Sequence, residues 1–177
     1  MIYQDLRVSL RKAAYTCLSE FFLDEASAPI IFSHLNGPEP TSSYVIINIL
    51  SATQKGRSYV STLTNELGEL AYIADYELSV QFAFCGNLSG EMANSFSHKL
   101  GGNPVVRESL ARNNLGYLRK SSIRRSPQRR ETEWVEYNNM DVTFSYTVSS
   151  LQLVDVIEHV LLKDNTTGDE QIIPPLP

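Results

Sequence analysis

The chain has 177 residues, of which 42% are apolar and 10% aromatic, and its 15 Lys and Arg against 20 Asp and Glu give a formal charge of -5. This length and apolar content suit one folded domain with its own core and exclude a wholly disordered chain. No apolar run approaches the roughly 20 residues of a membrane-spanning helix, and no apolar signal segment follows the charged first twelve residues, so we expect a soluble protein made in the cytosol.

The N-terminal part is predicted to contain one helix and one buried strand. Apolar residues at spacings of three and four over the first twenty residues predict an amphipathic helix. Residues 24–43 are a proline-containing connector, interrupted by the short apolar run 30–32. Residues 43–50 are β-branched and apolar on both faces, which predicts a central strand that is covered on both sides.

Two turns and a polar strand are predicted next. Residues 54–57 are predicted to form a turn around Gly56, residues 58–64 a polar strand, and residues 65–68 a second turn.

The clearest periodicity lies in residues 70–84, where every even position is apolar or aromatic and the positions between are mostly polar. This alternation predicts a long, half-buried strand. Fifteen residues exceed the usual strand length, so the strand either bends over the core, breaks near Asp75, or projects as a hairpin that contacts a neighbouring subunit.

Two helices are predicted in the middle of the chain. Apolar spacing marks a helix over residues 88–100, and Gly101 and Gly102 are predicted to end it in the left-handed conformation. Asn103 followed by Pro104 predicts the N-cap and first turn of a third, short helix.

The C-terminal part is predicted to consist of strands and a tail. Residues 115–123 and 134–148 are predicted strands, and residues 152–162 fit a strand or a helix. We therefore expect an α+β fold, in which an N-terminal helix and one or two central helices cover an antiparallel or mixed sheet. It forms a single domain over residues 1–162, followed by a mobile tail over residues 163–177.

The acidic total conceals a strongly basic segment over residues 119–130. Subtracting its charge of +6 leaves -11 for the rest of the chain. The six basic residues are Arg119, Lys120, Arg124, Arg125, Arg129 and Arg130.

Three interpretations of this basic segment remain open. It is a solvated loop that pairs with the carboxylates of Glu131, Glu133 and Glu136, a contact for nucleic acid phosphates, or a docking loop for an acidic protein surface. Arg predominates over Lys, which suits forked contacts with phosphate or carboxylate. Tyr117 and Trp134 only flank the segment, so stacking on single-stranded bases is not favoured.

Residues typical of catalysis or metal binding are not grouped in the sequence. His34, His98 and His159 lie far apart without ligands at metal-binding spacing, and Cys17 and Cys85 are expected to be buried, reduced thiols. We therefore expect no catalytic residues, no metal and no cofactor. An enzyme would require a pocket assembled from distant residues.

The order of these features resembles the neck and tail terminator proteins of tailed bacteriophages. The resemblance rests on the N-terminal helix, the strand Ser-Tyr-Val-Ile-Ile-Asn-Ile-Leu at 43–50, and the long strand that ends Phe-Ala-Phe-Cys-Gly at 82–86. It continues through the two central helices and the late strands, over residues 1–162.

The resemblance implies a non-enzymatic virion subunit. It implies a homo-oligomeric ring, typically a hexamer, between the tail tube protein and the head-side connector, with DNA passing through the lumen and no membrane contact. At this ring, the basic segment would attract DNA without base contacts or dock onto an adjacent subunit. The alternative is a small nucleic-acid-binding module that uses residues 119–130.

Overall fold

The computed structural model describes residues 2–33, 40–60, 69–130, 133–153, 160–163 and 170–173. The chain divides into two compact units. The first takes in Met1–Arg57 and Ala74–Val148, and the second takes in Ser58–Ile73 and Ser149–Pro177.

The described part contains three helices and ten strands. The helices are α1 (Ile2–Leu18), α2 (Ser89–Gly102) and α3 (Pro104–Arg112). The strands are β1 (Ile30–Phe32), β2 (Tyr44–Val60), β3 (Glu69–Cys85), β4 (Leu115–Lys120), β5 (Arg124–Arg125), β6 (Gln128–Arg130), β7 (Glu133–Val135), β8 (Tyr137–Leu153), β9 (Val160–Lys163) and β10 (Glu170–Ile173).

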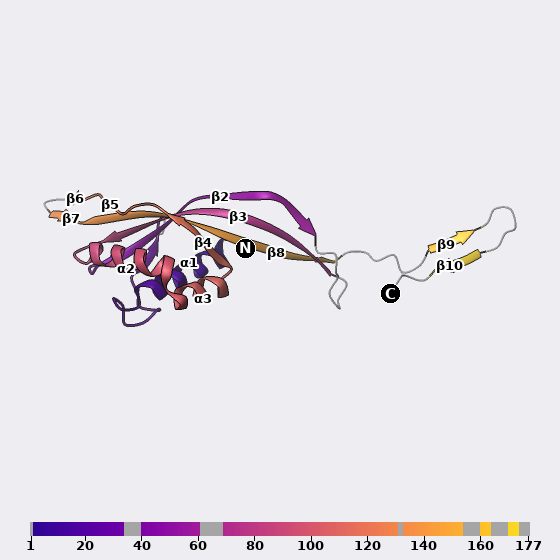
Figure 1. The fold of residues 1–177 in the computed structure, drawn as a ribbon, viewed down its shortest axis with the longest axis horizontal. Helices are drawn as coiled ribbons and strands as arrows, with labels where there is room; N and C mark the ends of the chain where they lie inside the picture. Colours follow the sequence, from indigo (N-terminus) through magenta and orange to yellow (C-terminus); the bar gives the residue numbers. More distant parts are fainter. Residues whose placement is uncertain are drawn as a thin grey trace. The chain divides into compact units, whose positions relative to one another are not determined.

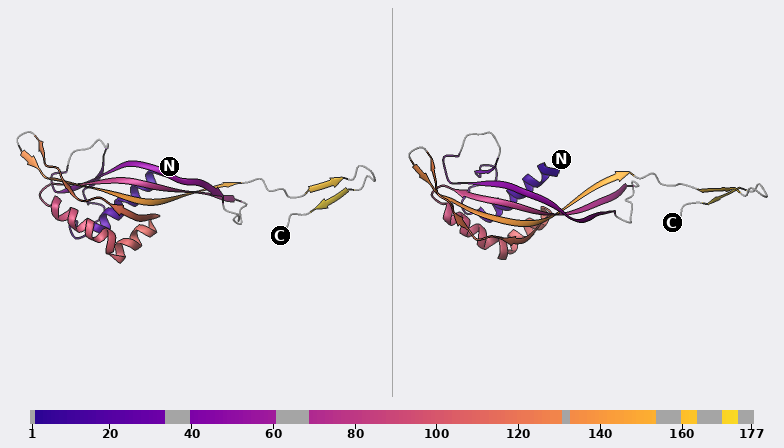
Figure 2. Two further views of the ribbon diagram at one scale, coloured as in Figure 1. Left: turned by 45° about the horizontal axis from the view of Figure 1, so that its top comes forward. Right: turned by 90° about the horizontal axis from the view of Figure 1, so that it is seen from above.

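The main sheet is mixed and has the strand order β1-β2-β3-β8-β4, with β5 also pairing with β8. β1 runs parallel to β2, whereas β4 and β5 run antiparallel to β8. Within the first unit, all three helices lie on one face of this sheet (Figures 1 and 2). This arrangement confirms the predicted α+β fold.

The core lies between the helices and that face of the sheet. The even-numbered residues of β3 from Leu78 to Phe84 are buried, as their alternation predicted, and they pack with residues of all three helices. Phe96 of α2 stacks on Phe82 and Phe84, with ring centroids 4.6 and 5.4 Å apart. These aromatic contacts fix α2 on the sheet.

A smaller cluster lies on the opposite face of the sheet, which we call the open face. It consists of Tyr44, Cys85 and Tyr137, and the two tyrosine hydroxyls are 3.4 Å apart. Both Cys85 and Cys17 are buried free thiols, as predicted. Burial raises the pKa of each thiol to about 12, so neither is a reactive thiolate at neutral pH.

The predicted capping of α3 is confirmed, whereas the predicted end of α2 is wrong. The Asn103 side chain accepts hydrogen bonds from the backbone N–H groups of Val105 and Val106, and Pro104 begins α3. α2 continues through Gly101 and Gly102, neither of which has a positive φ. Its C-cap is Asn103, which has an extended backbone. The cap of the next helix, not a left-handed glycine, therefore ends α2.

The turn predicted at residues 54–57 is also wrong, because β2 continues through it. Gly56 adopts φ +71° within the strand, so its conformational freedom serves an irregularity of β2 and not a reversal of the chain. β3 has no break near Asp75. The predicted turn at 65–68 lies outside the described residues.

β9 and β10 form a separate antiparallel pair in the second unit. The segment predicted at 152–162 includes the end of β8 and the start of β9, and residues 154–159 lie outside the described part. β10 lies in the segment that was predicted to be a mobile tail. The domain boundary at residue 162 stays a prediction.

Candidate functional site

The basic segment begins in β4, where two adjacent cations point to opposite faces of the sheet and a bulge decides which cation points to which face. Tyr117 pairs with Phe144 and Arg119 pairs with Thr143, so Leu118 is an extra residue in the ladder. Arg119 therefore lies on the open face. Lys120 lies opposite the buried Val142, on the helical face.

On the open face, Glu77 of β3 binds two cations from other strands. Its carboxylate accepts from Lys55 Nζ of β2 at 2.8 Å and from Arg119 Nη2 of β4 at 2.5 Å. The hydrogen bond from Lys55 is the main reason that the pKa of Glu77 is lowered, and the charge of Arg119 lowers it further. The three side chains thus connect three strands of the sheet.

The arginines of β5 form similar pairs. Arg124 pairs with Asp141 of β8, and Asp141 also accepts from Gln81 Nε2 at 3.3 Å. Arg125 forms a forked pair with Glu136, in which Nε lies 2.8 Å from Oε2. The hydrogen bonds from Arg125 lower the pKa of Glu136.

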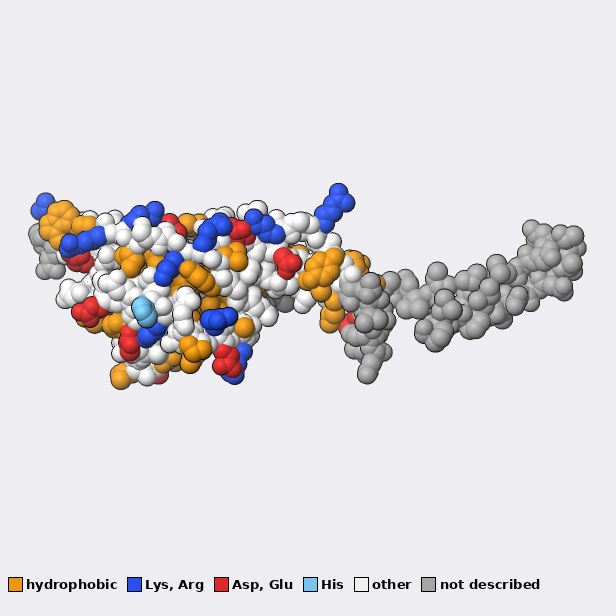
Figure 3. Space-filling model, in the orientation of Figure 1, with side chains coloured by type: hydrophobic (Ala, Val, Ile, Leu, Met, Phe, Trp, Pro, Cys, Tyr) orange, Lys and Arg blue, Asp and Glu red, His pale blue; other side chains and the backbone are white. Residues whose placement is uncertain are grey.

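In these pairs the cation is always the outer member. Lys55, Arg119, Arg124 and Arg125 have side chains 55 to 69% exposed, whereas the three carboxylates that they bind are 19 to 39% exposed. A partner that approaches any of these pairs from solvent therefore meets the positive group before the carboxylate. Figure 3 shows Lys and Arg side chains along the sheet side of the first unit.

The other three predicted cations lie apart from these pairs. Lys120 Nζ donates to the carbonyl and hydroxyl oxygens of Ser97 in α2, the hydroxyl at 2.8 Å. Arg129 is exposed and forms no ion pair with any described residue. For Arg130 the structure describes only the backbone, which pairs with Glu133.

The sequence-based reasoning missed most of the anionic partners. Of the three carboxylates expected to pair with the basic segment, Glu136 does so among the described side chains, whereas Glu77 and Asp141 were not expected to. Lys55 was missed because its segment was predicted to be a turn. The alternation of residues 70–84 was the available signal, since it places Glu77 on the polar face of β3.

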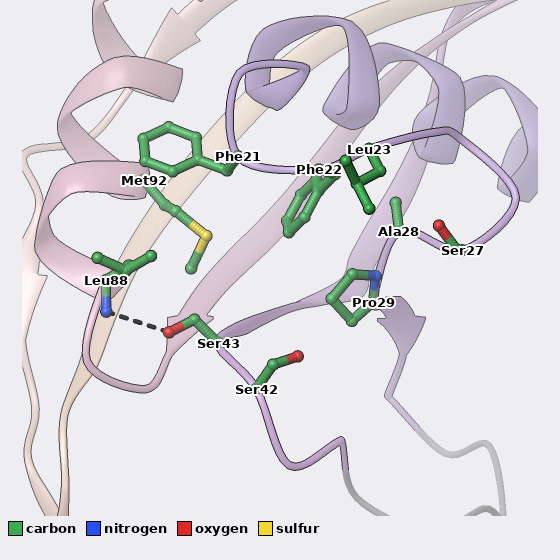
Figure 4. Close-up of a pocket in the computed structure, with 10 residues that line it drawn as sticks. All are labelled: Phe21, Phe22, Leu23, Ser27, Ala28, Pro29, Ser42, Ser43, Leu88 and Met92. Atoms are coloured by element: carbon green, nitrogen blue, oxygen red, sulfur yellow. Dashed lines mark hydrogen bonds between the residues drawn. The ribbon is translucent and has the colours of Figure 1, made fainter.

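An apolar pocket lies at the end of the sheet where β2 begins. Its volume is about 270 Å³, and its walls include Phe21, Phe22, Leu23, Leu88 and Met92 (Figure 4). The described residues that line it include no titratable side chain. This pocket suits an apolar side chain and not an acid–base reaction.

Gly86 lies against Ser43, one of the residues that line this pocket. It has φ +95°, and an added Cβ would lie 2.9 Å from Ser43 Cα and 2.8 Å from Ser43 Oγ. Glycine is therefore required for this close approach. Ser43 Oγ in turn accepts from the backbone N–H of Leu88 at 3.1 Å.

The described residues contain no group of three or more His, Cys, Asp or Glu that could hold a metal ion. His34 and His159 lie outside the described part. None of the described helices is long and apolar enough to cross a membrane.

Comparison with known proteins gave one family. A family model for phage neck terminator proteins matches residues 9–171, which include most of α1 and all later helices. No curated protein matches the chain.

Proposed function

We propose that this chain, which belongs to the phage neck terminator family and so has a structural role in the virion, forms a homomeric ring at the head-proximal end of the tail. In this proposal the ring, with a hexamer favoured, ends the tail tube and joins it to the head-side connector. The observation that carries it is the family match, which spans residues 9–171. We propose a purely structural role without catalysis.

We further propose that the open face is turned toward DNA in the lumen. The outward position of Lys55, Arg119 and Arg124 supports contact with phosphates without sequence readout. Arg125 lies opposite Asn138, whose side chain donates to Ser89 of α2, so it belongs to the helical face. Each cation is already paired with a carboxylate, so phosphate would compete with an existing partner. Such contacts are weak, as the passage of DNA requires.

Assembly tests the first proposal. We expect native mass spectrometry and negative-stain images of the purified protein, alone or with tail tube protein, to show a closed ring. A monomer at all concentrations in both samples would exclude the proposed ring.

Salt dependence tests the DNA contact and the alternative of a nucleic-acid-binding module. We expect duplex affinity to fall with rising salt, and the Lys55→Glu/Arg119→Glu/Arg124→Glu variant to lower the slope of log K against log salt by about 0.9 per lost phosphate contact. Arg107→Glu, on the exposed part of α3, is the matched control and should leave the slope nearly unchanged.

The ring subunit and the nucleic-acid-binding module differ in whether the chain must assemble. Binding by a chain that stays monomeric with tube protein would favour the nucleic-acid-binding module. An affinity that is undetectable at low salt, or that the triple variant leaves unchanged, would contradict both uses of the open face.

A further inference from the structure

The hairpin of β6 and β7 presents an exposed cation beside an exposed aromatic residue. Arg129 lies directly opposite Trp134 in the antiparallel register, so the two side chains share one face of the hairpin. Trp134 is 69% exposed, and Arg129 has no ion pair with any described residue. Figure 3 shows this end of the sheet as a hydrophobic surface flanked by Lys and Arg side chains.

Trp and Arg are the residue types that most often dominate protein–protein contacts. An indole left in water gains nothing from its large apolar surface, whereas burial in a partner recovers that free energy. None of the described residues buries Trp134. The hairpin is therefore suited to insertion into a second molecule.

The apolar pocket has the properties that such a side chain needs. Its volume of about 270 Å³ lies below the usual range for a small-molecule site but can admit one large side chain. Leu23 on its wall is fully exposed and Leu88 is 43% exposed. Phe22, Leu88 and Met92 surround the opening in Figure 4.

Exposed carboxylates adjoin, along the chain, residues that line this pocket. The exposed Asp24 and Glu25 follow Leu23 in the loop that forms one wall, and the exposed Glu91 adjoins Met92. Ser27, which lines the pocket, donates its backbone N–H and its hydroxyl to the Asp24 carboxylate, each at 2.8 Å, so this carboxylate lies beside the pocket. These hydrogen bonds, chiefly that of the backbone N–H, lower the pKa of Asp24. The rim thus offers negative charge to a cation beside an inserted indole.

Hydrogen bonds from α1 fix the loop that forms this wall. The Arg11 guanidinium of α1 donates to the carbonyl oxygens of Glu25, Ala28 and Ile30, each at 3.2 Å. The pocket wall is therefore organised before any partner arrives, which lowers the entropic cost of binding.

Hairpin and pocket lie at the same end of the first unit. Gly86 donates its backbone N–H to the carbonyl of Glu136 at 3.0 Å, which joins the chain beside the pocket to the residue that follows β7. Neighbouring subunits of a cyclic ring are related by a rotation that involves no shift along the ring axis. Two surfaces that meet between neighbours must therefore lie at the same position along that axis. An axis along the strands satisfies this condition.

We propose that the β6–β7 hairpin of one copy inserts Trp134 into the apolar pocket of the next copy, with Arg129 against the carboxylates of the rim. The contact is heterologous, because each copy uses two different surfaces, and it can therefore close a ring. This inference rests on the proposed ring and adds the surfaces that join its subunits.

Cross-linking between two differently labelled chains tests the contact. One chain carries Ser27→Cys at the pocket and the other carries Gln128→Cys on β6, and a short bismaleimide links them. The native cysteines are both buried, so they should not react. We expect a mixed dimer from this pair. We expect none from Val105→Cys on α3 paired with Gln128→Cys, because Val105 is exposed, as Ser27 is, but does not line the pocket.

Three substitutions test whether Trp134 and Arg129 stabilise the contact. Trp134→Ala in the Gln128→Cys chain should weaken association roughly 30-fold, the loss typical of a dominant interface aromatic. Glu91→Arg in the Ser27→Cys chain should also lower the yield, and Arg129→Glu in the other chain should restore it. Circular dichroism should confirm that each variant is folded.

The outcomes separate this inference from the proposed function. A cross-link no stronger than the Val105 control, or one that Trp134→Ala leaves unchanged, overturns the hairpin contact even if rings form. A cross-link that depends on Trp134, in a protein that forms no ring with tube protein, supports the contact and counts against the ring.

Discussion

At the scale of single residues, Gly86 and Gly101 show that two glycines at element boundaries can have different physical roles. Gly86 follows β3 with φ +95° and lies against the backbone of Ser43. Gly101 lies inside α2 without a positive φ, and an added Cβ would meet nothing within 4 Å. Only the first position requires glycine.

Gly86→Ala should destabilise the protein by roughly 2 to 4 kcal/mol, since alanine would be strained at this φ and would clash with Ser43. Urea unfolding measures the loss. Gly101→Ala is the matched control and should raise the free energy of unfolding by up to about 1 kcal/mol, because alanine favours a helix. Equal losses in both variants would contradict this distinction.

The sequence could not distinguish these two glycines. Each directly follows the apolar residue that ends a periodic segment, a position where glycine commonly ends an element. What separates them is tertiary: Ser43 lies against Gly86, whereas the cap at Asn103 ends α2 without a left-handed residue.

At the scale of elements, the start of α3 depends on one local device. Asn103 Oδ1 accepts from the N–H of Val105 at 2.9 Å and more weakly from that of Val106. The device is contained within four consecutive residues, which is why the sequence predicted it correctly.

Asn103→Ala should cost about 1 kcal/mol of stability, because it leaves these helix N–H groups without their side-chain acceptor. Asn103→Asp keeps an acceptor oxygen and should stay within a few tenths of a kcal/mol of the wild type. Thermal unfolding followed by circular dichroism compares the two. A loss as large for Asp as for Ala would show that the cap contributes nothing.

The placement of the basic segment could not be predicted in the same way. Arg119 and Lys120 are adjacent, so alternation puts them on opposite faces, and the bulge at Leu118 decides that Arg119 reaches the open face and Lys120 reaches α2. Arg119 and Glu77 are 42 residues apart, and Arg124 and Asp141 are 17 apart, so these pairs depend on the strand order. Composition identifies the cations but not their partners.

At the scale of the whole molecule, two of the ion pairs make stability dependent on pH. The pKa values of Glu77 and Glu136 are lowered in the folded state by their cationic partners. A lowered folded-state pKa stabilises the fold above the ordinary value of 4.5, and this contribution is lost as the pH falls through the folded-state pKa.

We therefore expect the urea concentration at the midpoint of unfolding to be constant near neutral pH and to decrease as the pH falls below about 4.5. In Glu77→Gln the decrease should be smaller, because one of the depressed carboxyl groups is gone. Asp75→Asn is the control, since Asp75 forms no ion pair among the described residues. Identical pH profiles for wild type and Glu77→Gln would show that this pair does not contribute.

β2 joins two regions of different local stability within one strand. Its residues from Tyr44 to Ile47 belong to the buried sheet, whereas every residue from Leu50 to Val60 is exposed. Backbone amides in the first stretch should exchange with solvent only on global unfolding, and those in the second through local opening. In the proposed ring, the exposed length of β2 could therefore rearrange on assembly at little cost to the core.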